Sequence, residues 1–143
     1  MNKTMKKIAA LLLALLLAVG LISCGSKKGF YDLWRDAIYE EDTSIGEGNT
    51  SFTVEIEVEE RVVAVAVKTN ETTVGAALLA NGLVEGEDGP YGLYIKKVNG
   101  IVADYDIDHS YWLFYINGEY AMTGVDSTEV AEGAVYRFVY TRE

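Results

Sequence analysis

The clearest pattern of hydrophobic and polar positions lies between Phe52 and Val58, where apolar residues alternate with polar ones. Alternation of this kind places the apolar side chains on one face of a β-strand and the polar side chains, among them Glu55 and Glu57, on the other. We therefore expect a half-buried strand with an acidic solvent face. The next run, Arg61 to Lys68, is apolar at six consecutive positions and predicts a strand covered on both faces.

A short helix is expected after these two strands. The polar segment Asn70–Thr73 offers an N-cap, and Val74 and Leu78 then share one helical face. Gly82 suits the position just after the helix, where a left-handed conformation is common. A helix of about two turns has little stability of its own, so burial of its apolar face must hold it.

The second half of the chain predicts antiparallel strands joined by tight turns. Leu93–Val98 leads into Asn99-Gly100, and Tyr111–Ile116 leads into Asn117-Gly118. Asn-Gly favours a two-residue type I′ turn, because both central residues must adopt positive φ. Each pair therefore predicts a β-hairpin.

Two further segments complete the predicted order of elements. The stretch Glu85–Gly92 is rich in acidic residues, Gly and Pro and is expected to form turns, whereas Ala134–Thr141 predicts a closing strand. Two strands, one helix and several antiparallel strands indicate an α+β fold, mainly antiparallel β-sheet with one short helix and β-grasp-like in arrangement. We expect Tyr111–Ile116 to be its central strand, with Trp112 and Phe114 beneath the helix.

The first residues predict a lipoprotein signal peptide. Three lysines precede a 15-residue apolar run that would span roughly 22 Å as a helix, less than the ~30 Å of a bilayer core. The sequence Leu21-Ile22-Ser23-Cys24 resembles the bacterial lipobox and holds the only cysteine of the chain. We expect residues 1–23 to be the signal, residues 24–49 a lipidated tether and N-terminal arm, and residues 50–143 the folded domain. The protein would be anchored through diacylglyceryl-Cys24 on the extracytoplasmic face of the cell membrane.

Charge narrows the range of partners. The chain has a formal net charge of −10, which becomes −13 after removal of the three lysines that precede Cys24. Such acidity argues against nucleic acid as a partner. Because no second cysteine is available for a disulfide, a hydrophobic core must hold the domain.

The N-terminal arm, Phe30 to Tyr39, allows two interpretations. Phe30, Trp34 and Ile38 recur at helical spacing, but the same residues suit an extended arm laid on the domain. We favour the docked arm, with Trp34 packed into the domain, over a helix that binds a partner.

An ordered set of motifs resembles a known group of proteins. The group consists of bacterial lipoproteins of unknown function whose domain is similar to the C-terminal domain of transcobalamin and intrinsic factor, and the resemblance spans residues 34–141. In those vitamin carriers the β-rich domain covers one face of cobalamin, so the resemblance implies a cobalamin-like ligand. The motifs that carry it are Gly92-Leu93-Tyr94, Val98-Asn99-Gly100, Ala103-Asp104-Tyr105-Asp106, Tyr111-Trp112-x-Phe114-Tyr115-Ile116-Asn117-Gly118, Gly124-Val125-Asp126-Ser127-Thr128 and Gly133-x-x-Tyr136-x-Phe138-x-Tyr140-Thr141.

Catalytic and metal chemistry have little support in the sequence. His109 and Ser110 are neighbours whose side chains would point to opposite faces of a strand, so they cannot form a catalytic pair. We therefore predict that the protein is not an enzyme. On an extended segment Asp104, Asp106 and Asp108 would place three carboxylates on one side, where they could bind Ca²⁺. The alternative is a solvated acidic turn, and we favour it.

Tyrosines provide the candidate ligand site. Tyr111 and Tyr115 share the face opposite Trp112 and could stack on a planar ligand or a partner, unless the N-terminal arm or another sheet covers them. Tyr94 and Asn117, which belong to the motifs of the resemblance, complete the candidate ligand-binding set. We therefore predict a non-catalytic cell-surface binding module that captures a small molecule such as a corrinoid for uptake. The alternatives are a protein–protein interaction domain and a Ca²⁺-dependent surface module.

Overall fold

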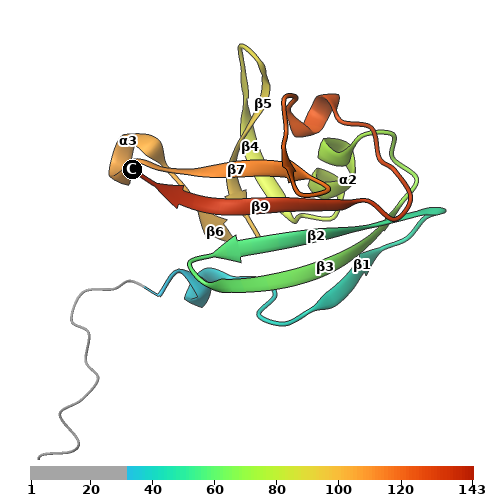
Figure 1. The fold of residues 1–143 in the computed structure, drawn as a ribbon, viewed down its shortest axis with the longest axis horizontal. Helices are drawn as coiled ribbons and strands as arrows, with labels where there is room; N and C mark the ends of the chain where they lie inside the picture. The colour runs from blue at the N-terminus through green and yellow to red at the C-terminus, as the bar shows by residue number, and fades with distance from the viewer. Residues whose placement is uncertain (1–31) are drawn as a thin grey trace, which may run out of the picture. The chain divides into compact units, whose positions relative to one another are not determined.

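The structure is a computed structural model that describes residues 32–143, and the predicted signal peptide and Cys24 lie outside the described residues. Residues Leu33–Glu143 form one unit with its own core. A six-stranded sheet has the order β1-β3-β2-β9-β7-β8, and a three-stranded sheet has the order β4-β5-β6 (Figure 1). The strands of the large sheet are β1 (Thr43–Gly46), β2 (Thr50–Val58), β3 (Arg61–Thr69), β7 (Ser110–Ile116), β8 (Glu119–Tyr120) and β9 (Val135–Arg142). The small sheet contains β4 (Val84–Gly89), β5 (Gly92–Val98) and β6 (Ile101–Val102).

The topology confirms the predicted α+β, β-grasp-like fold. Strands β2 and β9 run parallel at the centre of the large sheet, and antiparallel pairs extend it on both sides through β3 and β7. The helix α2 (Val74–Ala80) follows the first hairpin in the chain. The expectation that Tyr111–Ile116 is the central strand is wrong, because β7 has only the two-residue β8 beyond it. Within residues 32–143 no helix is long and apolar enough to cross a membrane.

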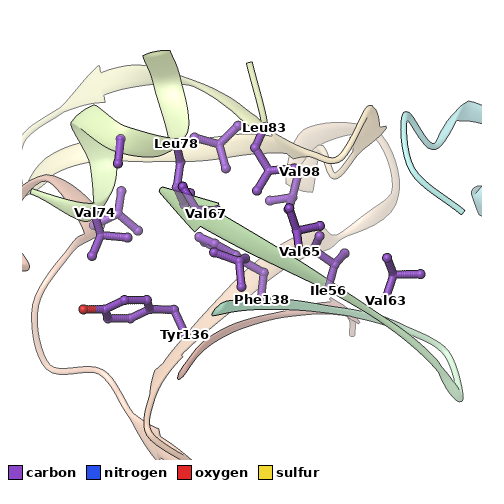
Figure 2. Close-up of a cluster of buried hydrophobic side chains, with 14 of the residues drawn as sticks. Ile56, Val63, Val65, Val67, Val74, Leu78, Leu83, Val98, Tyr136 and Phe138 are labelled. Carbon is purple, nitrogen blue, oxygen red and sulfur yellow. The ribbon is translucent and has the colours of Figure 1, made fainter. Parts of the chain in front are cut away.

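One face of the large sheet carries the core. Figure 2 shows Val74 and Leu78 of α2 close to Val67, Tyr136 and Phe138 of the sheet. All five side chains are buried. Apolar side chains on alternate positions of β2, β3 and β9 thus meet the helix and the small sheet, which explains why the alternating pattern was a reliable signal.

The other face of the large sheet, here called the outer face, is not covered by a second layer in the described part of the chain. Val62 on β3 is 41% exposed, and Ala66 on the same strand is also exposed. The prediction of a strand covered on both faces is therefore wrong. Valine and alanine at these positions reflect the preference of a sheet for small and β-branched residues rather than burial.

The segment expected to form turns is instead a strand. Residues 84–89 form β4, which pairs with β5 and shifts register between Glu85 and Gly86. A Cβ atom at Gly86 would lie 2.2 Å from the carbonyl oxygen of Tyr94, so glycine is needed there for close approach of the two backbones. Non-local pairing with β5 overrides the weak strand propensity of this acidic sequence.

Local signals placed the helix and both hairpins correctly. Thr73 Oγ1 accepts a hydrogen bond from the Ala76 amide at 3.2 Å and caps α2, as predicted. The two Asn-Gly pairs adopt positive φ at both residues, with values of 52° and 79° at residues 99 and 100 and 47° and 86° at residues 117 and 118. Both are therefore type I′ turns.

The N-terminal arm is docked on the domain. A 3₁₀ turn, η1 (Leu33–Asp36), places the Trp34 side chain in the core with 7% exposure, and the Arg61 guanidinium lies 4.4 Å from the centre of its ring. Ile38 is 54% exposed, so Trp34 and Ile38 do not share one buried stripe. Phe30 lies outside the described residues. Within residues 32–39 the docked arm is confirmed, and no α-helix is formed there.

Candidate functional site

The outer face contains a depression of about 680 Å³ near the turn between β7 and β8. The strands β2, β9 and β7 provide its floor, because these three strands are neighbours in the sheet. It is open to solvent and exposes both polar and apolar atoms. Its lining includes Glu55, Glu57, Tyr115, Asn117, Val135, Arg137 and Val139.

The Arg137 guanidinium is held between two carboxylates at the floor of this depression. Its Nε donates to Glu55 Oε2 at 2.8 Å, Nη2 contacts the same oxygen, and Nη1 lies 3.5 Å from Glu57 Oε1. The side chain of Arg137 is 40% exposed, so water screens these ion pairs and each stabilises the fold only slightly. Their main consequence is that the positions of one cation and two anions are fixed beside Tyr115.

Two of the four predicted ligand-binding residues lie together here. Tyr115 packs edge-to-face on Tyr120 with ring centres 5.8 Å apart and lines the depression. Asn117 contributes to the rim, but both its side chain and its main chain bond to Val135. Its side-chain Oδ1 accepts a hydrogen bond from the Val135 main-chain amide at 2.9 Å, and its main-chain amide donates to the Val135 carbonyl at 2.7 Å. Asn117 therefore positions the turn against β9.

The other two predicted residues lie elsewhere. Tyr111 is on the outer face, but its hydroxyl donates to Glu143 Oε1 at 3.4 Å. The Tyr105 hydroxyl donates to the other oxygen of the same carboxylate, Glu143 Oε2, at 3.2 Å. Loss of solvation and then the Glu143 charge raise the pKa of Tyr111, and the hydrogen bond to Glu143 raises the pKa of Tyr105. Tyr94 is on β5, in the small sheet.

The aspartates predicted as an alternative metal site do not share one side. Residues 105–108 form a helical turn, α3 (Tyr105–Asp108), so the expectation of an extended segment is wrong. Asp104 caps this turn by accepting the Asp106 amide at 3.0 Å. Asp108 binds the Ser110 hydroxyl and Arg142, and these contacts lower the pKa of its carboxyl. Aspartate favours such local capping bonds, and residues 32–143 contain no cluster of three His, Cys, Asp or Glu side chains arranged for a metal.

His109 and Ser110 are separated in their contacts. The His109 ring stacks on Tyr105 with centres 4.9 Å apart, whereas Ser110 Oγ accepts the Asp104 amide at 3.0 Å and donates to Asp108. The pair does not have the hydrogen bond between nucleophile and base that covalent catalysis requires.

A second hollow, here called the β5–β7 groove, was missed by sequence reasoning. It has a volume of about 350 Å³ and lies between β5 and the segment from β7 to Val125. Met122 and Tyr91 at its rim are 92% and 97% exposed, which identifies them as surface residues although each is large and apolar or aromatic. Its lining includes Tyr91, Leu93, Tyr94, Trp112, Phe114 and Met122.

The residues that the sequence did not single out have a common feature. Arg137 and Val139 alternate with the aromatic residues of the closing strand, so they lie on its opposite face, which sequence reasoning did not consider. Alternation within that strand could have placed Arg137 on the outer face. Nothing in the pattern could have placed it beside Glu55, because the pairing of β2 with β9 joins residues 82 positions apart.

Comparison with known proteins supports the fold. Seventeen chains of known structure match, and no curated protein sequence does. A protein from Ruminococcus gnavus ATCC 29149, described as a candidate metal-binding protein, has a TM-score of 0.62 and 27% identity, over 66% of this chain and 99% of that chain. Haptocorrin in complex with Cbi has a TM-score of 0.49 and 20% identity, over 84% of this chain and 28% of that chain.

A family model described as "Domain of unknown function (DUF4430)" matches residues 71–142. The matched segment includes α2, the small sheet, β7, β8 and β9. It also contains all the motifs on which the resemblance to bacterial lipoproteins of unknown function rests. The chain therefore belongs to the DUF4430 family of domains of unknown function.

Proposed function

We propose that the protein is a non-catalytic binding module that holds one face of a flat small molecule, such as a corrinoid, against the outer face of its large sheet. The observation that carries the proposal is the depression of about 680 Å³ beside Tyr115, on a sheet face that no other described layer covers. Ligand sites in proteins combine apolar and aromatic surface with a few polar groups that fix orientation.

The lining of the depression suits a flat ligand with polar edges. The Tyr115 ring offers a stacking surface, and Val135 and Val139 add apolar contact. Arg137, Glu55 and Glu57 provide charged groups that can bind amide or carbonyl groups at the edge of the ligand. Because the site is open, it contacts one side of the ligand, and a second domain or partner would be needed to enclose it.

A titration of the domain tests this role. We expect the chain from Gly25 onward to bind cobalamin or cobinamide, and the Tyr115→Ala variant to bind about tenfold more weakly, because it loses the aromatic surface. Absorbance and isothermal titration calorimetry would measure both affinities. Tyr94→Ala is the matched control, since Tyr94 lies in the small sheet and away from the depression. Absence of binding at high micromolar ligand, or equal loss in both variants, would contradict the proposal.

The protein is further proposed to reside on the extracytoplasmic face of the cell membrane, anchored by a diacylglyceryl group on Cys24. The support is the basic start, the apolar run and the lipobox-like sequence that ends in the only cysteine. Two acyl chains give a stable anchor, which a single chain does not.

Metabolic labelling of the full-length chain with radioactive palmitate tests the anchor. We expect the wild type to incorporate label and the Cys24→Ser variant to incorporate none, because a hydroxyl cannot form the thioether. The unlipidated variant should also remain at the size of the uncleaved precursor. Ser23→Ala, which keeps a small residue before the cysteine, should be labelled like the wild type. Label that persists in Cys24→Ser would show that the lipid is attached elsewhere.

A further inference from the structure

We propose that the free edge of β7 binds an extended, basic peptide segment of a partner protein by β-strand addition. The inference is independent of the outer-face ligand. It rests on the main-chain groups of β7 that point away from β9, here called the β7 edge, and on the β5–β7 groove beside them. In Figure 1, β9 lies along one side of β7. On the other side, β8 pairs only with Tyr115 and Ile116, the last two residues of β7.

The register shows which groups form the β7 edge. The Asn117 amide donates to the Val135 carbonyl at 2.7 Å, so the odd-numbered residues of β7 direct their main-chain groups toward β9. The main-chain groups of the even-numbered residues Trp112 and Phe114 point away from β9. The Phe114 carbonyl accepts the Ala121 amide at 3.0 Å. Within residues 32–143 the Phe114 amide and both main-chain groups of Trp112 have no strand partner.

The outermost strands β1, β4, β6 and β8 carry features that hinder strand pairing. Strands β6 and β8 are two residues long and β1 is four. Strand β4 carries Glu85, Glu87 and Asp88 and contains the register shift. Short strands, charges and bulges are the features by which proteins prevent unwanted strand pairing. The seven residues of β7, SYWLFYI, include no charge and no proline, so the β7 edge lacks these protective features.

The groove gives this edge a place for side chains. Trp112, Leu113 and Phe114 all line it, although the Leu113 side chain belongs to the outer face, so the main chain of β7 forms part of its wall. The indole Nε1 of Trp112 is buried and has no hydrogen-bond partner. Every second side chain of an added strand would point toward the Trp112 side of the sheet, where the groove offers Leu93 and Met122 for contact.

The negative charge of the described part of the chain favours a basic peptide at the β7 edge. All 22 acidic residues of the chain lie at or after Asp32, together with only seven of its 12 basic residues. Asp106 and Glu119 lie near the two ends of the β7 edge and are exposed. Lys96 on β5 and Arg142 on β9 already form ion pairs with Glu87 and Asp108. A second copy of this acidic chain would be repelled, whereas a lysine-rich strand would be attracted.

Amide hydrogen exchange on the ¹⁵N-labelled chain from Gly25 onward tests the proposal, because it reports single residues. The probe is a blocked ten-residue peptide of alternating lysine and valine. We expect it to slow exchange of the Trp112 and Phe114 amides by about tenfold or more, and to leave the already paired Tyr111 and Leu113 amides unchanged. A peptide with two central prolines, or with glutamate in place of lysine, should give no protection.

Two charge-reversal variants test the electrostatic part. Glu119→Lys, on β8 near the end of the β7 edge, should weaken binding of the lysine–valine peptide about fivefold relative to Glu47→Lys. Glu47 is exposed beside β1, at the opposite edge of the sheet, so both variants have the same net charge. Equal affinities would overturn the choice of a basic occupant, as would protection by the glutamate peptide.

Three further outcomes would overturn strand addition itself. These are absence of protection at millimolar lysine–valine peptide, equal protection by the proline peptide, and a dimer whose Trp112 and Phe114 amides are protected without peptide. Tyr115→Ala should leave peptide binding unchanged, so failure at the β7 edge and failure of the outer-face ligand site are distinguished.

Discussion

Replacing Trp34 with alanine is expected to lower the free energy of unfolding by about 3 kcal/mol, because the change leaves a large cavity in the core. The Trp34 side chain is 7% exposed and joins the same buried cluster as Ile56 and Phe138. Its Nε1 also donates to the Val58 carbonyl over a long 3.4 Å, and Arg61 covers its ring. The arm that carries Trp34 precedes the family match at residue 71, so the experiment asks whether this segment belongs to the folding unit.

Urea denaturation of the chain from Gly25 onward, followed by tryptophan fluorescence and circular dichroism, would measure the loss. Ile38→Ala is the matched control in the same arm, and its 54% exposure predicts a change below about 0.5 kcal/mol. If Trp34→Ala were as mild as Ile38→Ala, the arm would be an accessory of the domain rather than part of its core.

The elements that sequence reasoning placed correctly are those with local determinants. Alternation over residues 52–58 reports the side-chain geometry of one strand, and Thr73 and Gly82 cap α2 through bonds and conformations within a few residues. Each Asn-Gly pair specifies its turn without help from the rest of the chain. The fold class followed from the order of these elements.

The misplaced elements depend on contacts between distant segments. Strand β4 exists because β5 pairs with it, and its acidic residues gave no strand signal. The spacing of Asp104, Asp106 and Asp108 suggested extension, but capping of the turn by Asp104 decided the local structure.

The candidate site shows the same division. Alternation correctly placed Tyr111 and Tyr115 on one face of β7. It could not reveal that Arg137 lies beside Tyr115, or that Tyr94 belongs to another sheet. Nor could it reveal that Glu143 accepts a hydrogen bond from the Tyr111 hydroxyl. Periodicity assigns a face within one strand, whereas a site requires knowledge of which strands are neighbours.

Replacing Asn99 with alanine is expected to lower the free energy of unfolding by about 3 kcal/mol, whereas the same change at Asn117 should cost about 1 kcal/mol. Both residues have positive φ in a type I′ turn, and the sequence presents the two turns as equivalent. The structure distinguishes them by burial. Asn99 is fully buried, and its amide group accepts the Tyr39 amide at 2.9 Å and donates to the Tyr39 carbonyl at 2.8 Å. Asn117 is exposed, so water can replace its bond to Val135.

Glycine variants separate the two contributions to this difference. Glycine tolerates positive φ, so Asn117→Gly should be nearly neutral, while Asn99→Gly should still lose about 2 kcal/mol because the Tyr39 groups remain unpaired. Urea denaturation of the four variants would measure these values. Equal stability of the two glycine variants would mean that Asn99 acts only as a turn residue. A clear difference would mean that one hairpin turn, through the side-chain amide of Asn99, secures the N-terminal arm that also carries Trp34.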